Sequence, residues 1–238
     1  MKDGINKSLK RAILFDLDGV IIDSMGCHSK SWAQAVKTKL NVNVSETYFL
    51  INEGRNSKDI LMDIWQTHQL KEDPGQWQAV SDYRDELFLN EFTPKLVPGV
   101  FELIQQVSEI GYGLGVATGS TRPVANEVLS QTGVRQFFSQ MVTSEDVHNS
   151  KPDPEPYLLL LNRLDSQPEN ALVIENAPLG IRSALAANLI CLAVATTNAR
   201  EILSHATIVF NNLKEVRKYV KQEYEISNGV GTWSFVLK

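Results

Sequence analysis

The chain has 238 residues, of which 43% are hydrophobic and 21% are charged, and its formal net charge at pH 7 is −5. This length can hold one domain with an insertion, and the composition is ordinary for a globular protein. A net negative charge gives no reason to expect nucleic acid or an anionic membrane as a partner. The two cysteines, Cys27 and Cys191, have neither metal-ligand spacing nor a disulfide pattern, which favours a reducing compartment.

No apolar run approaches the length that is needed to cross a bilayer. The first ten residues are polar and lead directly to the first predicted strand, which is unlike a signal peptide. We therefore expect a cytoplasmic monomer that acts on a small molecule, with neither nucleic acid nor a membrane as its partner.

The first predicted element is a short buried strand at residues 12–15, and Asp16-Leu17-Asp18-Gly19 follows it directly. Two buried carboxylates need a cation, hydrogen-bond donors or protons. Mg²⁺ would satisfy both and leave one of them free to act as a nucleophile. The alternative is that the aspartates and the glycine only turn the chain at the end of the strand.

Residues 24–92 show a mainly helical pattern, whereas the rest of the chain alternates between strands and helices. Further strands are predicted at residues 114–118, 140–143, 171–174, 191–195 and 208–210. Helices are predicted at residues 100–109, 123–131, 154–164, 180–187 and 213–222. This alternation predicts an α/β fold with a parallel sheet. The apolar tail at residues 229–237 is expected to pack on this core.

Three segments that follow predicted strands carry polar groups suited to an anion or a cation. Thr118-Gly119-Ser120 offers hydroxyl and backbone N–H donors. Lys151 lies beside two prolines that stiffen the chain around its ammonium. Glu175 and Asn176 offer oxygen ligands. Because the carboxyl ends of parallel strands bind ligands together, we expect these groups and the aspartate pair to meet.

The motifs FDLDGVIIDS, VATGS, KPDPEPY and VIENAPLGIRSA resemble the four signatures of the haloacid dehalogenase-like phosphohydrolases, in the β-phosphoglucomutase-like branch. The resemblance covers about residues 11–220 and implies a Rossmann-like parallel sheet, formed by residues 1–23 and 93–238. It also implies phosphoryl transfer through a phospho-aspartate with Mg²⁺. It also implies that residues 24–92 are a helical cap domain, inserted into the core and closing over the site.

The resemblance implies a role for each matching residue. Asp16 would be the nucleophile, and Asp18 would be the general acid and base. Thr118 and Lys151 would hold the transferring phosphoryl group. The metal ligands would be Asp16, Asp18, Glu175 and Asn176. Since Asp18 has to carry a proton for part of the cycle, we expect its surroundings to raise its pKa.

One departure from the family pattern lies at Glu175-Asn176, where the family usually has two acidic residues. Asparagine offers an oxygen but no charge, so the metal site has one negative charge fewer. The site could bind Mg²⁺ more weakly with Glu175 moved inward, or Glu53 could supply the missing carboxylate from the cap. A third alternative is a protein without activity that binds a metabolite.

Substrate choice is expected to depend on the cap loop at residues 52–58. Arg55 or Lys58 could meet a distal anionic group, and Gly54 permits a close approach. Glu53 is either solvated or enters the site as a metal contact, which would favour a compact substrate such as inorganic pyrophosphate. His28 either orients Asp18 when the cap closes or only packs between the domains.

Mutases of this branch usually have Lys-Asn after the second motif, where this chain has Thr121-Arg122. We assign substrate binding to Gly119, Ser120 and Arg122 of the core and to His28, Glu53 and Arg55 of the cap. The match to the mutases at residues 121–122 is poor, which favours hydrolysis. We expect a Mg²⁺-dependent phosphatase of a sugar phosphate or of pyrophosphate. The alternative enzyme is a hexose-phosphate mutase.

Overall fold

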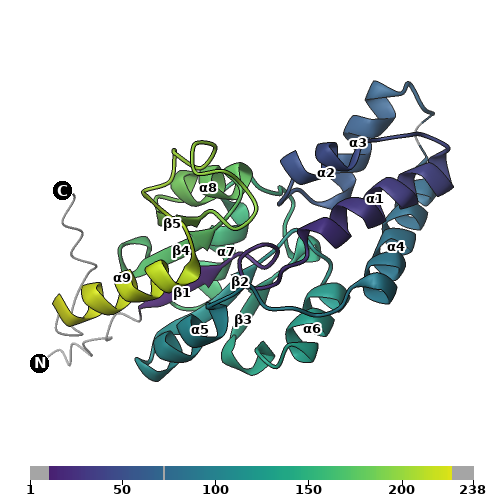
Figure 1. Cartoon of the computed structure of the whole chain (residues 1–238). Coiled ribbons are helices and arrows are strands. Elements are labelled where there is room, and N and C mark those ends of the chain that lie inside the picture. Colours follow the sequence, from purple (N-terminus) through teal and green to yellow (C-terminus); the bar gives the residue numbers. More distant parts are fainter. Residues whose placement is uncertain (1–10, 72, 227–238) are drawn as a thin grey trace, which may run out of the picture.

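The structure is a computed structural model, and it describes residues 11–71 and 73–226. Its centre is a parallel sheet with the strand order β3-β2-β1-β4-β5-β6 (Figure 1). The strands are β1 (Ala12–Phe15), β2 (Gly113–Ala117), β3 (Gln140–Val142), β4 (Ala171–Glu175), β5 (Ile190–Val194) and β6 (Ile208–Phe210). The Rossmann-like parallel sheet is thus confirmed, and each predicted strand is present with its ends displaced by at most one residue.

Helices cover both faces of the sheet. The core helices are α5 (Val100–Glu109), α6 (Arg122–Gln131), α7 (Glu155–Arg163), α8 (Pro178–Ala186) and α9 (Leu213–Ile226). Single 3₁₀ turns lie at η1 (Arg135–Phe137), η2 (Ser144–Asp146) and η3 (Pro168–Asn170). Helix α9 extends four residues beyond the predicted end at residue 222. The tail at residues 229–237, for which packing on the core was predicted, lies outside the described residues.

The side chains of β1 show why the sheet needs both layers. Successive residues of a strand point to opposite faces. Ile13 and Phe15 join the apolar cluster that contains residues of α5, α6 and α9. Ala12 and Leu14 join the cluster that contains residues of α7 and α8. The whole strand is buried, as expected for a central strand of a parallel sheet.

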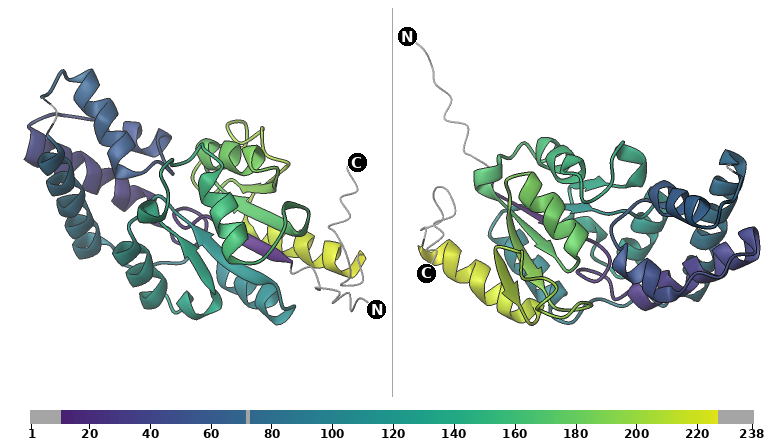
Figure 2. Two further views of the ribbon diagram at one scale, coloured as in Figure 1. Left: turned by 180° about the vertical axis from the view of Figure 1, so that it is seen from behind. Right: turned by 90° about the horizontal axis from the view of Figure 1, so that it is seen from above.

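Between β1 and β2 the chain forms a separate group of helices at one end of the molecule (Figures 1 and 2). These are α1 (Met25–Leu40), α2 (Glu46–Ile51), α3 (Ser57–Thr67) and α4 (Pro74–Glu91). They enclose their own apolar cluster, which includes Trp32, Phe49 and Trp65. We propose that residues 24–92 form the cap domain, inserted into a core of residues 1–23 and 93–238, of which 11–23 and 93–226 are described.

The chain leaves and re-enters the core along one path. Ile22 forms an antiparallel bridge with Leu96, and the Asp23 N–H donates to the Lys95 carbonyl oxygen over 2.8 Å. This pairing fixes the base of the cap beside β1, next to the carboxyl end of the sheet. None of the helices in the described ranges is long and apolar enough to span a membrane.

Candidate active site

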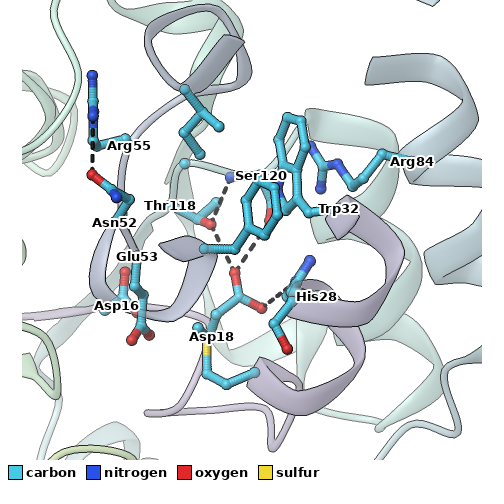
Figure 3. Close-up of a pocket in the computed structure, with 16 residues that line it drawn as sticks. Asp16, Asp18, His28, Trp32, Asn52, Glu53, Arg55, Arg84, Thr118 and Ser120 are labelled. Carbon is cyan, nitrogen blue, oxygen red and sulfur yellow. Dashed lines mark hydrogen bonds and ion pairs between the residues drawn. The ribbon is translucent and has the colours of Figure 1, made fainter. Parts of the chain in front are cut away.

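Loops at the carboxyl ends of β1 and β2 meet the cap around a cavity of about 60 Å³ (Figure 3). The core contributes Asp16, Asp18, Thr118, Gly119 and Ser120, and the cap contributes Met25, His28, Ser29, Trp32, Phe49, Asn52, Glu53, Gly54, Arg55, Ile60 and Arg84. A cavity of this size has room for only a few water molecules. Cap residues His28 and Glu53 contact Asp18 and Asn176 of the core, so the cap is closed over the core in this structure.

Asp16 and Lys151 form a buried ion pair at the end of β1. Lys151 Nζ donates to Asp16 Oδ1 over 2.5 Å and to Glu175 Oε1 over 2.7 Å. Burial raises the pKa of Asp16 to about 8, since it outweighs the attraction of Lys151, and Glu175 and Asp18 add to the rise. Burial alone would lower the pKa of Lys151, but the two carboxylates raise it above its ordinary value. Lys151 is thus a fixed cation beside Asp16.

Asp18 is surrounded by hydroxyl groups and one imidazole (Figure 3). Its oxygens lie 2.5 Å from Ser24 Oγ, 2.8 Å from His28 Nε2, 3.1 Å from Ser120 Oγ and 3.4 Å from Thr118 Oγ1. Burial opposes ionisation, but the charge and hydrogen bond of His28 and the hydroxyl donors lower the pKa of Asp18 to about 2. The prediction of a raised pKa is therefore wrong for the closed state, because the sequence did not show how many donors the carboxylate meets.

The structure brings His28 of α1 into the site. Its ring stacks on Phe88 of α4, with ring centroids 3.9 Å apart and planes 6° from parallel. This stacking fixes the imidazole while Nε2 faces Asp18. His28 thus packs on Phe88 within the cap and contacts a core carboxylate, and its role in orienting Asp18 stays a prediction.

Asn176 and Glu53 meet across the boundary between core and cap. Asn176 Nδ2 donates to Glu53 Oε1 over 2.8 Å and to Thr197 Oγ1 over 2.7 Å. Both side chains are buried, Glu53 with 8% and Asn176 with 0% of its surface exposed. Burial and the nearby charge of Asp16 raise the pKa of Glu53 well above its ordinary value. Glu53 is therefore not a solvated loop residue.

Glu175 faces Lys151 and the main chain. Its second oxygen accepts hydrogen bonds from the backbone N–H groups of Asn176 and Ala177, at 2.9 and 3.2 Å. The sequence-based assignment made Glu175 a metal ligand, but in this arrangement its oxygens are directed to these donors.

The oxygen atoms around Asp16 and Asn176 decide whether Mg²⁺ fits the site. No three His, Cys, Asp or Glu side chains in the described part of the chain are grouped to hold a metal ion by themselves. However, the buried Oδ1 of Asn176 has no hydrogen-bond partner among the described residues. Burial raises the pKa values of Asp16 and Glu53, and the neighbouring carboxylates add to both shifts. An amide oxygen beside buried carboxylates is a fitting environment for a hard cation that retains several waters.

Two predicted cations are engaged elsewhere. The guanidinium of Arg55 donates to Asp63 Oδ2 over 2.5 Å and to Asn52 Oδ1 over 3.0 Å. It is therefore directed away from Asp16 and Asp18 (Figure 3). Arg122 pairs with Asp146, and it is not among the described residues that line the cavity. The assignment of Arg122 to the substrate stays a prediction, since in this structure its guanidinium faces Asp146 and not the cavity. Lys58 is exposed and does not line the cavity either.

The glycines of both loops allow the cap to close. A β carbon on Gly119 would lie 2.9 Å from the Arg55 carbonyl oxygen. A β carbon on Gly54, which has a φ of +91°, would lie 3.1 Å from Lys151 Cδ. The core loop that carries Gly119 and the cap loop that carries Gly54 and Arg55 therefore lie in close backbone contact at the site.

Sequence reasoning missed Arg84, which lines the cavity from α4. Only 3% of its side chain is exposed, and it lies over the ring of Trp32 at 4.8 Å. It pairs with Asp85 over 3.0 Å and donates to Ser57 Oγ over 3.0 Å. Its Nε has no partner among the described residues. An arginine in a helical cap gives no sequence signal, since most such residues are solvated.

A family model described as haloacid dehalogenase-like hydrolase matches residues 13–194 of the chain. Among the solved structures, a β-phosphoglucomutase from Clostridium difficile has a TM-score of 0.80 with 23% identity. That similarity covers 92% of this chain and 99% of that chain. It agrees with the fold described above.

Two relatives with named activities are phosphatases. Validoxylamine A 7′-phosphate phosphatase of Streptomyces hygroscopicus subsp. limoneus is 30% identical over 213 residues, which covers 87% of this chain and 96% of that protein. The pyrophosphatase PpaX of Oceanobacillus iheyensis is 29% identical over 191 residues, which covers 78% and 83% of the two chains. The chain therefore belongs to the haloacid dehalogenase-like hydrolases, in the branch of the β-phosphoglucomutases and phosphatases, and is a phosphatase-type enzyme.

Proposed function

We propose that this protein is a Mg²⁺-dependent phosphohydrolase that acts on a small phosphorylated metabolite through a phospho-aspartate. The observation that carries the proposal is the buried Asp16–Lys151 ion pair, which lies beside Asp18 beneath a closed cap. A carboxylate held at a strand end next to a fixed cation is suited to attack phosphorus, since phosphoryl transfer depends on alignment and charge stabilisation.

In the first step, a carboxylate oxygen of Asp16 forms a bond to phosphorus while the bond to the leaving oxygen breaks. Asp18 gives that oxygen a proton, so it has to be protonated in this step although His28 and the hydroxyl donors favour its ionised form in the closed structure. In the second step, Asp18 takes a proton from water, the water oxygen bonds to phosphorus, and Asp16 is released with inorganic phosphate. The depressed pKa of Asp18 suits this second, basic role.

Lys151 and Thr118 hold the transferring phosphoryl group during both steps, in this proposal. Mg²⁺ would be held by Asp16, the main-chain carbonyl of Asp18 and Asn176 Oδ1, and would supply positive charge beside the phosphoryl oxygens. Glu53 would close over that site from the cap, so the charge that Asn176 lacks would be restored only after closure. The cap also keeps bulk water from the phospho-aspartate.

Inorganic pyrophosphate is the substrate that this cavity suits best. The closed space of about 60 Å³ favours a compact ligand. Arg84 is a buried cation in the cavity wall and could meet a second anionic group. PpaX, a relative at 29% identity, is named a pyrophosphatase. A sugar phosphate is the second candidate substrate, and a hexose-phosphate mutase is less well supported, because Arg122 is paired with Asp146.

The test is phosphate release with Mg²⁺ from pyrophosphate, hexose phosphates and other phosphometabolites. Wild type should prefer pyrophosphate, and Asp16→Asn should abolish release from every compound. Glu53→Gln and Arg84→Gln should each lower pyrophosphate turnover about tenfold or more. Arg135→Gln is the control, since Arg135 Nε binds Asn126 on the core surface.

Hydrolysis and the choice of substrate are tested by different results. If wild type released phosphate no faster than Asp16→Asn from every compound, the proposal of a phosphohydrolase would be wrong. Isomerisation of β-glucose 1-phosphate would then be assayed. If hexose phosphates were preferred and Glu53→Gln and Arg84→Gln had no effect, only the substrate assignment would be wrong.

A further inference from the structure

A tyrosine hydroxyl is buried beneath the site, in a place where packing needs only an aromatic ring. Tyr157 lies in the first turn of α7 and has no exposed surface. Its ring belongs to the apolar cluster between the sheet and α8, which phenylalanine would fill as well. A buried hydroxyl is costly unless it is paired. Tyr157 OH donates to Glu175 Oε1 over 2.7 Å.

Glu175 accepts four hydrogen bonds, which occupy its carboxylate completely. Oε1 accepts from Tyr157 and from Lys151, and Oε2 accepts from two backbone N–H groups. A carboxylate has about four lone-pair positions, so none is left for another ligand. The space for this carboxylate depends on Gly180, where a β carbon would lie 1.7 Å from Glu175 Oε1.

The ammonium of Lys151 is fixed in the same way. Its three acceptors are Asp16 Oδ1, Glu175 Oε1 and the Ala117 carbonyl oxygen, at 2.5, 2.7 and 3.2 Å. An ammonium has three protons, so Glu175 and the Ala117 carbonyl hold it in place while the third proton faces Asp16, which would receive the phosphoryl group. Lys151 Nζ also lies 4.9 Å from the centroid of the Tyr157 ring. Tyr157 therefore contacts Lys151 with its ring and Glu175 with its hydroxyl.

We propose that Tyr157 is a positioning residue for the phosphoryl-binding lysine. Its hydroxyl fixes Glu175, and Glu175 fixes the ammonium of Lys151 where the phosphoryl group develops charge. Donors that are already in place need no rearrangement during the reaction. This inference rests on the proposed function, and it assigns Glu175 to Lys151 as an anchor.

The experiment compares Tyr157→Phe, which removes only the hydroxyl, with Tyr48→Phe as the matched control. Tyr48 OH contacts Asp63 on the cap, outside the cavity. Tyr157→Phe should lower kcat about ten- to hundredfold and leave KM within about threefold, since the lost interaction acts on the transition state. The affinity for orthovanadate with Mg²⁺, measured by calorimetry, should fall by the same factor as kcat. Tyr48→Phe should leave all three unchanged.

The inference is overturned if Tyr157→Phe is folded and its kcat and vanadate affinity stay within about twofold of wild type. Glu175→Gln tests it independently of how Tyr157→Phe folds, because an unchanged vanadate affinity there would show that Lys151 needs no anchor. If wild type binds vanadate but hydrolyses no compound, the proposed hydrolysis fails. The vanadate affinities of the variants then still decide the role of Tyr157.

Discussion

At the scale of single residues, the site divides its negative charge between the two domains. Asn176 stands on the core where the family usually has an acidic residue, and its amide donates to Glu53 of the cap. A carboxylate at both positions would place two like charges in a buried contact, which is costly. The asparagine therefore permits a cap glutamate to enter a site that already contains several carboxylates.

This pairing predicts an exchange experiment. Asn176→Asp should lower kcat/KM about tenfold or more, because the new carboxylate repels Glu53 when the cap closes. Glu53→Gln should also lower it, through the loss of charge. The double variant Glu53→Gln with Asn176→Asp keeps the total charge and can form the reverse hydrogen bond, so most of the activity should return. A single Asn176→Asp variant more active than wild type would contradict this account.

At the scale of elements, hydrogen bonds between α3 or α4 and the core loops hold the cap closed. Thr121, at the start of α6, donates to Asp85 of α4 over 2.7 Å. Asp85 also pairs with Arg84, which lines the cavity. Ser150, beside the site lysine, donates to Asp59 of α3. These contacts join the cap to the same two core loops that carry Ser120 and Lys151.

Removal of one such contact should affect closure more than chemistry. Thr121→Val should raise KM several-fold and leave kcat within about twofold, since the closed form becomes less populated before the reaction begins. Small-angle X-ray scattering of the ligand-free variant should show a larger radius of gyration. Thr132→Val is the control, because its hydroxyl bonds to the Val128 carbonyl oxygen within α6. An equal change in both variants would argue against a closure role.

At the scale of the whole molecule, buried carboxylates of the core and the cap lie close together at the site. Asp16 and Glu53 both have raised pKa values, and they belong to the core and the cap respectively. A cation between them would stabilise the folded molecule and hold its two domains together, because a ligand that binds only the folded state stabilises it.

Mg²⁺ should therefore raise the thermal unfolding midpoint by several degrees at about 100 times its Kd, where the stabilisation is about 2.7 kcal/mol. Asn176→Ala should reduce this shift, since Oδ1 is removed from the donor set. Differential scanning calorimetry with Mg²⁺ and with EDTA measures both. A shift of equal size in wild type and in Asn176→Ala would remove Asn176 from the metal site.

The sequence by itself determined the sheet, its strand positions and the loops that carry the polar groups. Strand propensity and strand-end turns are local properties, so apolar runs such as residues 12–15 placed the strands within one residue. Since parallel strands align their carboxyl ends, the motif residues Asp16, Thr118 and Lys151 had to lie near one another.

Only the tertiary structure decided which partner each polar side chain has. Arg55 lines the cavity but its guanidinium pairs with Asp63, and Arg84, which has no motif, lines the cavity as well. The hydroxyl of Tyr157 and the low pKa of Asp18 depend equally on groups that are distant in sequence. The physical reason is that hydrogen bonds and burial are set by distances of a few ångströms between separate elements, which packing fixes and local sequence does not encode.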